Sequence, residues 1–135
     1  MLARLSVIAL LLVSLAACGG SSALAGTWAL SSVNGAAGIS VPTGGRIDIT
    51  FTSDGKVSGQ GACNSYSGSY TVNGQAIVFS PLASTQKACA APLMAIDTAY
   101  FAALQATTSW QVSGSSLTLT GPGGRISLVY TNNQG

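Results

Sequence analysis

The chain has 135 residues, of which only 6 % are charged, and its formal net charge at pH 7 is +2. So few lysines and arginines argue against a nucleic-acid partner, because that affinity depends on many contacts between basic side chains and phosphates. The sequence contains no histidine, which removes the commonest general base, the usual catalytic triads and most zinc sites. We therefore expect no catalytic residue, no metal site and no cofactor.

The first 17 residues are typical of a secretory signal peptide. One positive charge, Arg4, precedes an apolar run over residues 5–13, and small residues follow it. The apolar run is too short to cross a bilayer, which takes about 20 apolar residues in a helix. We therefore assign residues 1–17 to a signal peptide that is removed.

The end of this segment resembles the lipobox of bacterial lipoproteins. It reads Leu15-Ala16-Ala17-Cys18, and the resemblance implies that Cys18 is diacylated and becomes the first mature residue. The alternative is an ordinary signal peptide with a cysteine near its end. In the lipoproteins that it resembles, an aspartate after the cysteine favours the inner membrane. Gly19 occupies that position, which favours the periplasmic face of the outer membrane in a cell with two membranes. In a cell with one membrane, the domain would lie outside the plasma membrane.

Residues 18–25 are expected to form the lipidated cysteine and a flexible tether, because the glycines and serines after Cys18 show no apolar periodicity. Two or more acyl chains anchor a protein stably, whereas one binds only marginally. We expect the membrane to be a partner through this anchor. The folded domain is then 26–131, followed by a short tail over 132–135.

Alternating apolar residues predict antiparallel strands in the first half of the domain. The pattern is clear in 26–33 and in 46–52, where large apolar residues alternate with small or polar ones. Asp54-Gly55 is a favoured centre for a two-residue hairpin turn, so 56–61 should return beside 46–52.

Two further segments, 69–79 and 109–119, share one pattern. Each has an aromatic residue, then valine two places on, a turn ending in glycine, and apolar residues at alternate places. Both are predicted to be β-hairpins with positive φ allowed at Gly74 and Gly114. The segment 125–130 is predicted to be the last strand.

Residues 91–107 carry the one helical pattern of the chain. Pro92 suits a first turn, where the N–H that it lacks is not needed. One face is apolar over three turns, and Met94 and Phe101 should widen the face that packs on the sheet. Asp97 is expected to interact with the positive end of the helix dipole. The residues of the apolar face are Leu93, Ile96, Tyr100 and Leu104.

The cysteine count predicts one disulfide. If Cys18 is lipidated, Cys63 and Cys89 remain as an even pair in an oxidising compartment. The alternative is two buried free thiols.

Polar residues, glycines and aromatics are concentrated between Gly59 and Tyr70, around Cys63. The spacing there is Gly59-x-Gly61-x-Cys63-Asn64-x-Tyr66-x-Gly68-x-Tyr70, and Ala83-Ser84-Thr85-x-x-Ala88-Cys89 follows. These two motifs, in this order of elements, resemble the META domain family of the bacterial heat-shock protein HslJ. The resemblance covers about 110 residues, essentially the whole mature chain.

The resemblance implies a mainly antiparallel α+β fold, an open or cracked β-barrel of about 7–8 strands with one helix packed on it. It also implies an envelope location, and some relatives are linked to heat stress or novobiocin resistance. Two residues depart from the family: Lys87 stands where an apolar residue is usual, and Asp97 where glutamate is usual. Lys87 puts burial of this side of the loop in doubt.

Each residue of the motifs has a structural explanation. Glycines such as Gly61 and Gly68 allow a bend or a close backbone approach, and Asn64 can bond the backbone of a tight loop. Tyr66 and Tyr70 can bury their rings while each hydroxyl finds a partner. Ser84 and Thr85 belong to the second motif, for which we expect a structural role.

Ser84 and Lys87 also have the S-x-x-K spacing of penicillin-recognising enzymes. The companion motifs are missing and the domain is much too small for that fold, so a Ser–Lys hydrolase is a remote alternative.

The favoured function is a non-enzymatic envelope lipoprotein that acts in protein contact, envelope maintenance or stress. The expected protein partner is another envelope protein. A carrier of a small apolar or lipid ligand inside the barrel is the second hypothesis, and large inward residues such as Trp28 argue mildly against it.

Overall fold

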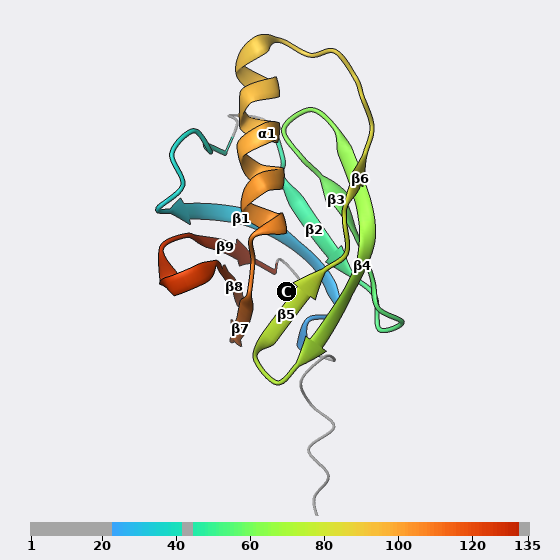
Figure 1. Ribbon diagram of the computed structural model, residues 1–135, viewed down its shortest axis with the longest axis vertical. Coiled ribbons are helices and arrows are strands. Elements are labelled where there is room, and N and C mark those ends of the chain that lie inside the picture. Colours follow the sequence, from blue (N-terminus) through green and yellow to red (C-terminus); the bar gives the residue numbers. More distant parts are fainter. Residues whose placement is uncertain (1–22, 42–44, 133–135) are drawn as a thin grey trace, which may run out of the picture.

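A computed structural model describes residues 23–41 and 45–132. The predicted signal peptide over 1–17 and the predicted lipidation of Cys18 lie outside the described residues. The described chain forms an antiparallel β-barrel with one helix beside it (Figure 1).

The strands and helices follow one another in this order: β1 (Gly26–Asn34), β2 (Asp48–Phe51), β3 (Lys56–Gln60), β4 (Ser65–Asn73), β5 (Ala76–Phe79), β6 (Ala83–Ser84), α1 (Ala91–Gln105), β7 (Ser109–Ser113), β8 (Ser116–Thr120), the 3₁₀ turn η2 (Pro122–Gly124) and β9 (Ser127–Thr131).

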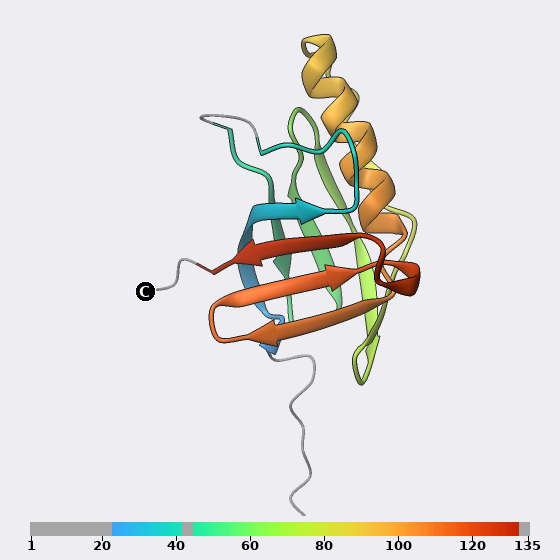
Figure 2. The ribbon, with the colours of Figure 1, turned by 90° about the vertical axis from the view of Figure 1, so that its left-hand side faces the viewer.

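Eight strands close into a ring. They pair in the order β3-β2-β1-β9-β8-β7-β5-β4, and β4 pairs again with β3. The hairpin strands β7 and β8 and the last strand β9 lie side by side in Figure 2. The narrowest seam joins β5 to β7 through the single pair Ala76 and Ser109. The prediction of a small barrel of 7–8 strands with one helix is confirmed.

Strand boundaries differ from the prediction in the middle of the chain. β4 begins at Ser65, so residues that were expected to form a bend already belong to a long strand. Its first half pairs with β3 on one side and with the two-residue β6 on the other. β6 was not predicted, because two residues are too few to show a period of two.

The inward side chains fill the barrel with one apolar cluster. It contains residues from all eight strands of the ring and from α1. Two indole N–H groups are satisfied inside it: Trp28 donates to the Leu24 carbonyl at 2.9 Å, and Trp110 donates to the Gly74 carbonyl at 3.0 Å. Such filling argues against a ligand-sized cavity in the centre of the barrel.

Helix α1 buries a narrower face than predicted. Tyr100 and Leu104 are fully buried, as expected, but Met94 is 41 % exposed. The expectation that Met94 widens the packed face is therefore wrong. Met94 instead lines a pocket between the helix and residues 84–88.

A chain of three tyrosine hydroxyls crosses the core. Tyr130 and Tyr100 are 2.8 Å apart at their hydroxyl oxygens, Tyr100 and Tyr66 are 3.1 Å apart, and Tyr66 donates to the Asp48 carbonyl at 2.7 Å. Each hydroxyl has one proton, and a carbonyl can only accept. The order of donation is therefore Tyr130 to Tyr100 to Tyr66 to Asp48, with no proton left over.

Burial raises the pKa of all three phenols above the ordinary value of 10. The main cause is loss of water around a group that would become an anion. Charge on Tyr130 further raises the pKa of Tyr66, whose hydrogen bond with Tyr100 acts the other way, and both neighbouring tyrosines raise the pKa of Tyr100. A pKa that folding raises makes the folded state hold protons that the unfolded state loses. Each raised pKa therefore contributes stability to the folded state below pH 10, and this contribution is lost as the pH rises further.

We accordingly expect the free energy of unfolding to fall above about pH 10, by up to about 1.4 kcal/mol per pH unit for each buried tyrosine. Tyrosinate absorbance and near-ultraviolet circular dichroism should change in one transition. A rise of tyrosinate absorbance near pH 10 with the dichroism intact would contradict this prediction. Refolding on return to neutral pH serves as the control.

Candidate functional site

The two sequence motifs meet at one end of the barrel. Residues 61–64 form the loop between β3 and β4, and Cys63 in this loop bonds to Cys89, which precedes α1. The Cα atoms of the two cysteines are 6.2 Å apart, within the range for unstrained disulfides. The predicted disulfide is confirmed, and it connects segments 26 residues apart in sequence.

Asp97 lies under this loop and binds its backbone. One carboxylate oxygen accepts the Cys63 N–H at 3.1 Å, and the other accepts the Asn64 N–H at 2.8 Å and the Asn64 side-chain amide at 3.2 Å. The side chain is 4 % exposed. A carboxylate at this depth needs such donors, because burial without hydrogen bonds is costly.

The expected role of Asp97 at the helix dipole is wrong. Asp97 lies in the second turn of α1, whose first turn contains no acidic residue, and the dipole effect falls off within the first turn. Its partners are the N–H groups of a loop far away in sequence. The structural role predicted for this residue is therefore supported, but through a tertiary contact.

Asn64 uses its whole side chain to join three segments. Its amide group faces Asp97 of α1, while its carbonyl oxygen accepts the Thr85 hydroxyl at 2.9 Å and the Lys87 N–H at 2.7 Å. The Thr85 hydroxyl oxygen in turn accepts the Ser65 N–H at 3.2 Å. These bonds connect the start of β4, the segment after β6 and the helix.

The glycines of the motif allow close approaches. A Cβ at Gly61 would overlap the Asp97 carboxylate, and one at Gly59 would overlap the Asp48 carbonyl and lie 2.5 Å from the Tyr66 hydroxyl. A Cβ at Gly68 would come within 2.8 Å of Leu82. The predicted reason for glycine, close backbone approach, holds at all three positions. Tyr70 completes the motif: its ring packs edge-on against Phe51 and its hydroxyl donates to the Thr52 carbonyl.

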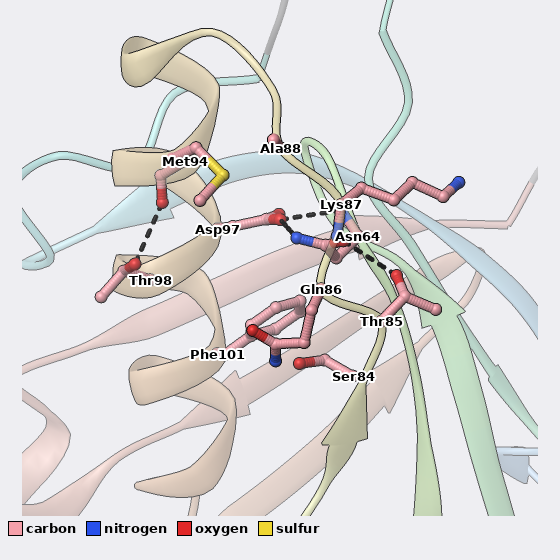
Figure 3. A pocket seen from close by; sticks show the side chains of 10 residues that line it. All are labelled: Asn64, Ser84, Thr85, Gln86, Lys87, Ala88, Met94, Asp97, Thr98 and Phe101. Atoms are coloured by element: carbon pink, nitrogen blue, oxygen red, sulfur yellow. Dashed lines mark hydrogen bonds between the residues drawn. The ribbon is translucent and has the colours of Figure 1, made fainter.

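A shallow pocket of about 270 Å³ lies beside this network (Figure 3). One wall is α1, and the other is the chain from β6 towards the disulfide; Asn64 and Asp97 form its inner end. The residues around it are Asn64, Ser84, Thr85, Gln86, Lys87, Ala88, Met94, Asp97, Thr98 and Phe101.

Ser84 and Lys87 line this pocket but do not form a catalytic pair. Figure 3 shows the Lys87 side chain extending away from Ser84 and from the helix. Lys87 is exposed, in line with the departure from the family pattern at this position. A lysine that activates a serine must lie within hydrogen-bond reach of its hydroxyl.

Sequence reasoning missed two contributors to this end of the barrel. Asp97 was recognised as structural, but not as the acceptor for the Cys63–Asn64 loop. Gln105, which donates to the Ser80 carbonyl at 3.0 Å and accepts the Leu82 N–H at 3.0 Å, was not considered. An acid within an otherwise apolar helix was the available signal for Asp97; a glutamine at a helix end gives no comparable signal.

The sequence model of the META domain family matches residues 22–133. The chain belongs to the META domain family. This match covers the whole described structure, from the entry into β1 to the end of β9.

Solved structures support the same fold. A protein from Burkholderia xenovorans determined by NMR is 30 % identical with a TM-score of 0.69, and the match covers 85 % of this chain and 87 % of that one. A second NMR structure is 24 % identical with a TM-score of 0.61, covering 80 % and 89 % of the two chains. A DUF4847 family protein from Bacteroides vulgatus is 16 % identical with a TM-score of 0.61, covering 83 % and 95 %. No curated protein matches the chain.

Two features are absent from residues 23–41 and 45–132. None of the helices there is long and apolar enough to cross a membrane. Nor do three or more histidine, cysteine, aspartate or glutamate side chains gather there in a way that suits a metal ion.

Replacing Asp97 tests its importance for stability. Asp97→Ala should lower the free energy of unfolding by about 3 kcal/mol or more, because it leaves three buried N–H donors without their acceptor. Urea unfolding measures this loss. Thr98→Ala is the matched control, since Thr98 is exposed and bonds only within its own helix. Equal stability of the two variants would contradict the assigned role.

Removing the disulfide tests the second connection. The double variant Cys63→Ser, Cys89→Ser should be less stable by about 3.5 kcal/mol, from the chain entropy of the 26-residue separation. Its urea midpoint should match that of the reduced native protein and should not respond to a reductant. A double variant as stable as the oxidised protein would refute this estimate.

Proposed function

We propose that this META domain protein is a non-enzymatic envelope lipoprotein that acts through contact with other envelope proteins, in envelope maintenance or stress. The signal peptide and lipobox that the sequence predicts support the envelope location, and the membrane is a partner through acylated Cys18. The periplasmic face of the outer membrane is the proposed site.

One observation supports the non-enzymatic part of this proposal: polar groups of the two motifs bond to one another and to Asp97 of α1. The Asp97 carboxylate, the Asn64 side chain and the Thr85 hydroxyl are each engaged by partners within the fold. A general base or nucleophile needs a reactive group free to meet a substrate. These groups form a connection between segments instead.

The two other hypotheses have less support. A carrier would need space inside the barrel, where apolar side chains form one continuous cluster. A Ser–Lys hydrolase would need Lys87 beside Ser84, but the lysine extends away from it.

Crosslinking in the native envelope, followed by mass spectrometry, tests the proposal. We expect wild-type protein to fractionate with membranes, to carry acyl mass on Cys18 and to crosslink repeatedly to the same envelope protein. The variant Cys18→Ala should lose the acyl mass and the membrane association, since two acyl chains account for stable anchoring. Membrane association that survives this substitution would refute the lipid anchor, and repeated recovery of no partner would refute the contact function.

A further inference from the structure

Among the described residues, the short strand β6 has one edge without a neighbouring strand. The Thr85 N–H donates to the Ser65 carbonyl at 3.0 Å, while the Ser65 N–H donates to the Thr85 hydroxyl. Thr85 and Ser65 therefore occupy a hydrogen-bonded position of the ladder, joined by one backbone bond. Hydrogen-bonded and non-bonded pairs alternate in an antiparallel ladder. The next pair, Ser84 and Tyr66, is therefore non-bonded, and the Ser84 N–H and C=O point away from β4.

Helix α1 covers this edge at one end only. The Gln105 side chain accepts the Leu82 N–H at 3.0 Å and donates to the Ser80 carbonyl at 3.0 Å. Two residues further along, the Ser84 N–H faces the pocket of about 270 Å³. Gln86 is two residues beyond Ser84, so its backbone N–H and C=O point the same way. Within the described residues, neither group forms a hydrogen bond.

The opposite wall of the pocket is α1, which contributes the apolar side chains of Met94 and Phe101 and, between them, Thr98, whose hydroxyl donates to the Met94 carbonyl. Phe101 is half-buried, and Met94 is one of three exposed large apolar side chains in the described residues. The backbone groups of Ser84 and Gln86 therefore face a helix surface that is apolar at Met94 and Phe101. Edges of this kind are templates for pairing with another chain.

The charges around the pocket favour a neutral occupant. Both oxygens of the Asp97 carboxylate are occupied by N–H donors. The Lys87 ammonium group extends away from the helix in Figure 3. An occupant therefore meets backbone hydrogen-bonding groups on one side and Met94 and Phe101 on the other, without a free charge between them. The uncharged Gln86 side chain lies beside Phe101 in Figure 3.

We propose that this groove, defined as the space between residues 84–88 and α1, binds a neutral, extended peptide segment of another protein. The inference rests on the proposed contact function and names its site. The peptide backbone pairs with Ser84 and Gln86 as an added strand, and one apolar side chain of the peptide packs on Met94 and Phe101. Strand addition of this kind takes affinity from main-chain hydrogen bonds and specificity from alternate side chains.

A defined peptide tests this pairing. The probe is acetyl-Thr-Leu-Thr-Leu-Thr-amide, added to the full ¹⁵N-labelled chain, with a version N-methylated at both leucines as the control. We expect the probe to shift the amide resonances of Ser84 and Gln86 and to slow their exchange with solvent. N-methylation should weaken binding about tenfold or more, because it removes two donors from the ladder.

Three single-residue variants locate the site. Met94→Gln should weaken binding of the probe several-fold, because it removes the apolar contact without touching the core. Val78→Gln is the matched control: Val78 is 63 % exposed on β5, outside the groove, and binding should remain as in the parent. Gln86→Pro should also weaken binding, since it removes a backbone donor that has no partner in the fold.

Four outcomes overturn the inference. The first is no shift of the Ser84 or Gln86 resonance up to about 5 mM probe, and the second is equal binding of the probe and the N-methylated peptide. The third is an equal loss of binding in Val78→Gln and Met94→Gln, and the fourth is a shift of the same resonances with protein concentration alone, which indicates a second copy as occupant. The proposed contact function is judged separately by envelope crosslinking. Recovery of the same partner by Met94→Gln would leave that function standing while this site falls.

Discussion

The carboxylate of Asp97 is the contact on which the end of the barrel depends. A buried aspartate binds two consecutive backbone N–H groups and the side chain of Asn64, and so fixes the β3–β4 loop against the helix. Asn64 also bonds to the segment after β6, and the disulfide joins the loop to the same segment covalently. Removing one partner of such a network leaves the others buried and unpaired, which is why its members act together.

The tyrosine chain serves the same purpose deeper in the barrel. Tyr66 of β4, Tyr100 of α1 and Tyr130 of β9 bring strands from opposite parts of the chain to one helix. Buried polar groups of this kind specify which elements pack together, because each donor needs its own acceptor. The concentration of polar residues in the central motif is thus explained by internal hydrogen bonding, and this is the physical basis for proposing a non-enzymatic protein.

The groove beside β6 follows from the same arrangement. Asn64 and the disulfide hold the chain after β6 against the β3–β4 loop, while Gln105 bonds the chain before β6 to the helix. Between these two attachments the edge of β6 is neither paired nor covered. A fold that otherwise removes its strand edges by closing a barrel therefore leaves a short one open, next to the exposed side chain of Met94.

Much of the fold follows from the sequence alone. Periodicity predicted the hairpins over 69–79 and 109–119 and the helix over 91–107, because these patterns repeat over several residues, and counting cysteines predicted the Cys63–Cys89 bond. Tertiary structure decided the rest. The two-residue β6 and the contacts of Asp97 and Gln105 depend on groups 16 or more residues apart in sequence. No local pattern encodes such distances, since they arise only when the barrel closes and brings the loop, the edge strand and the helix together.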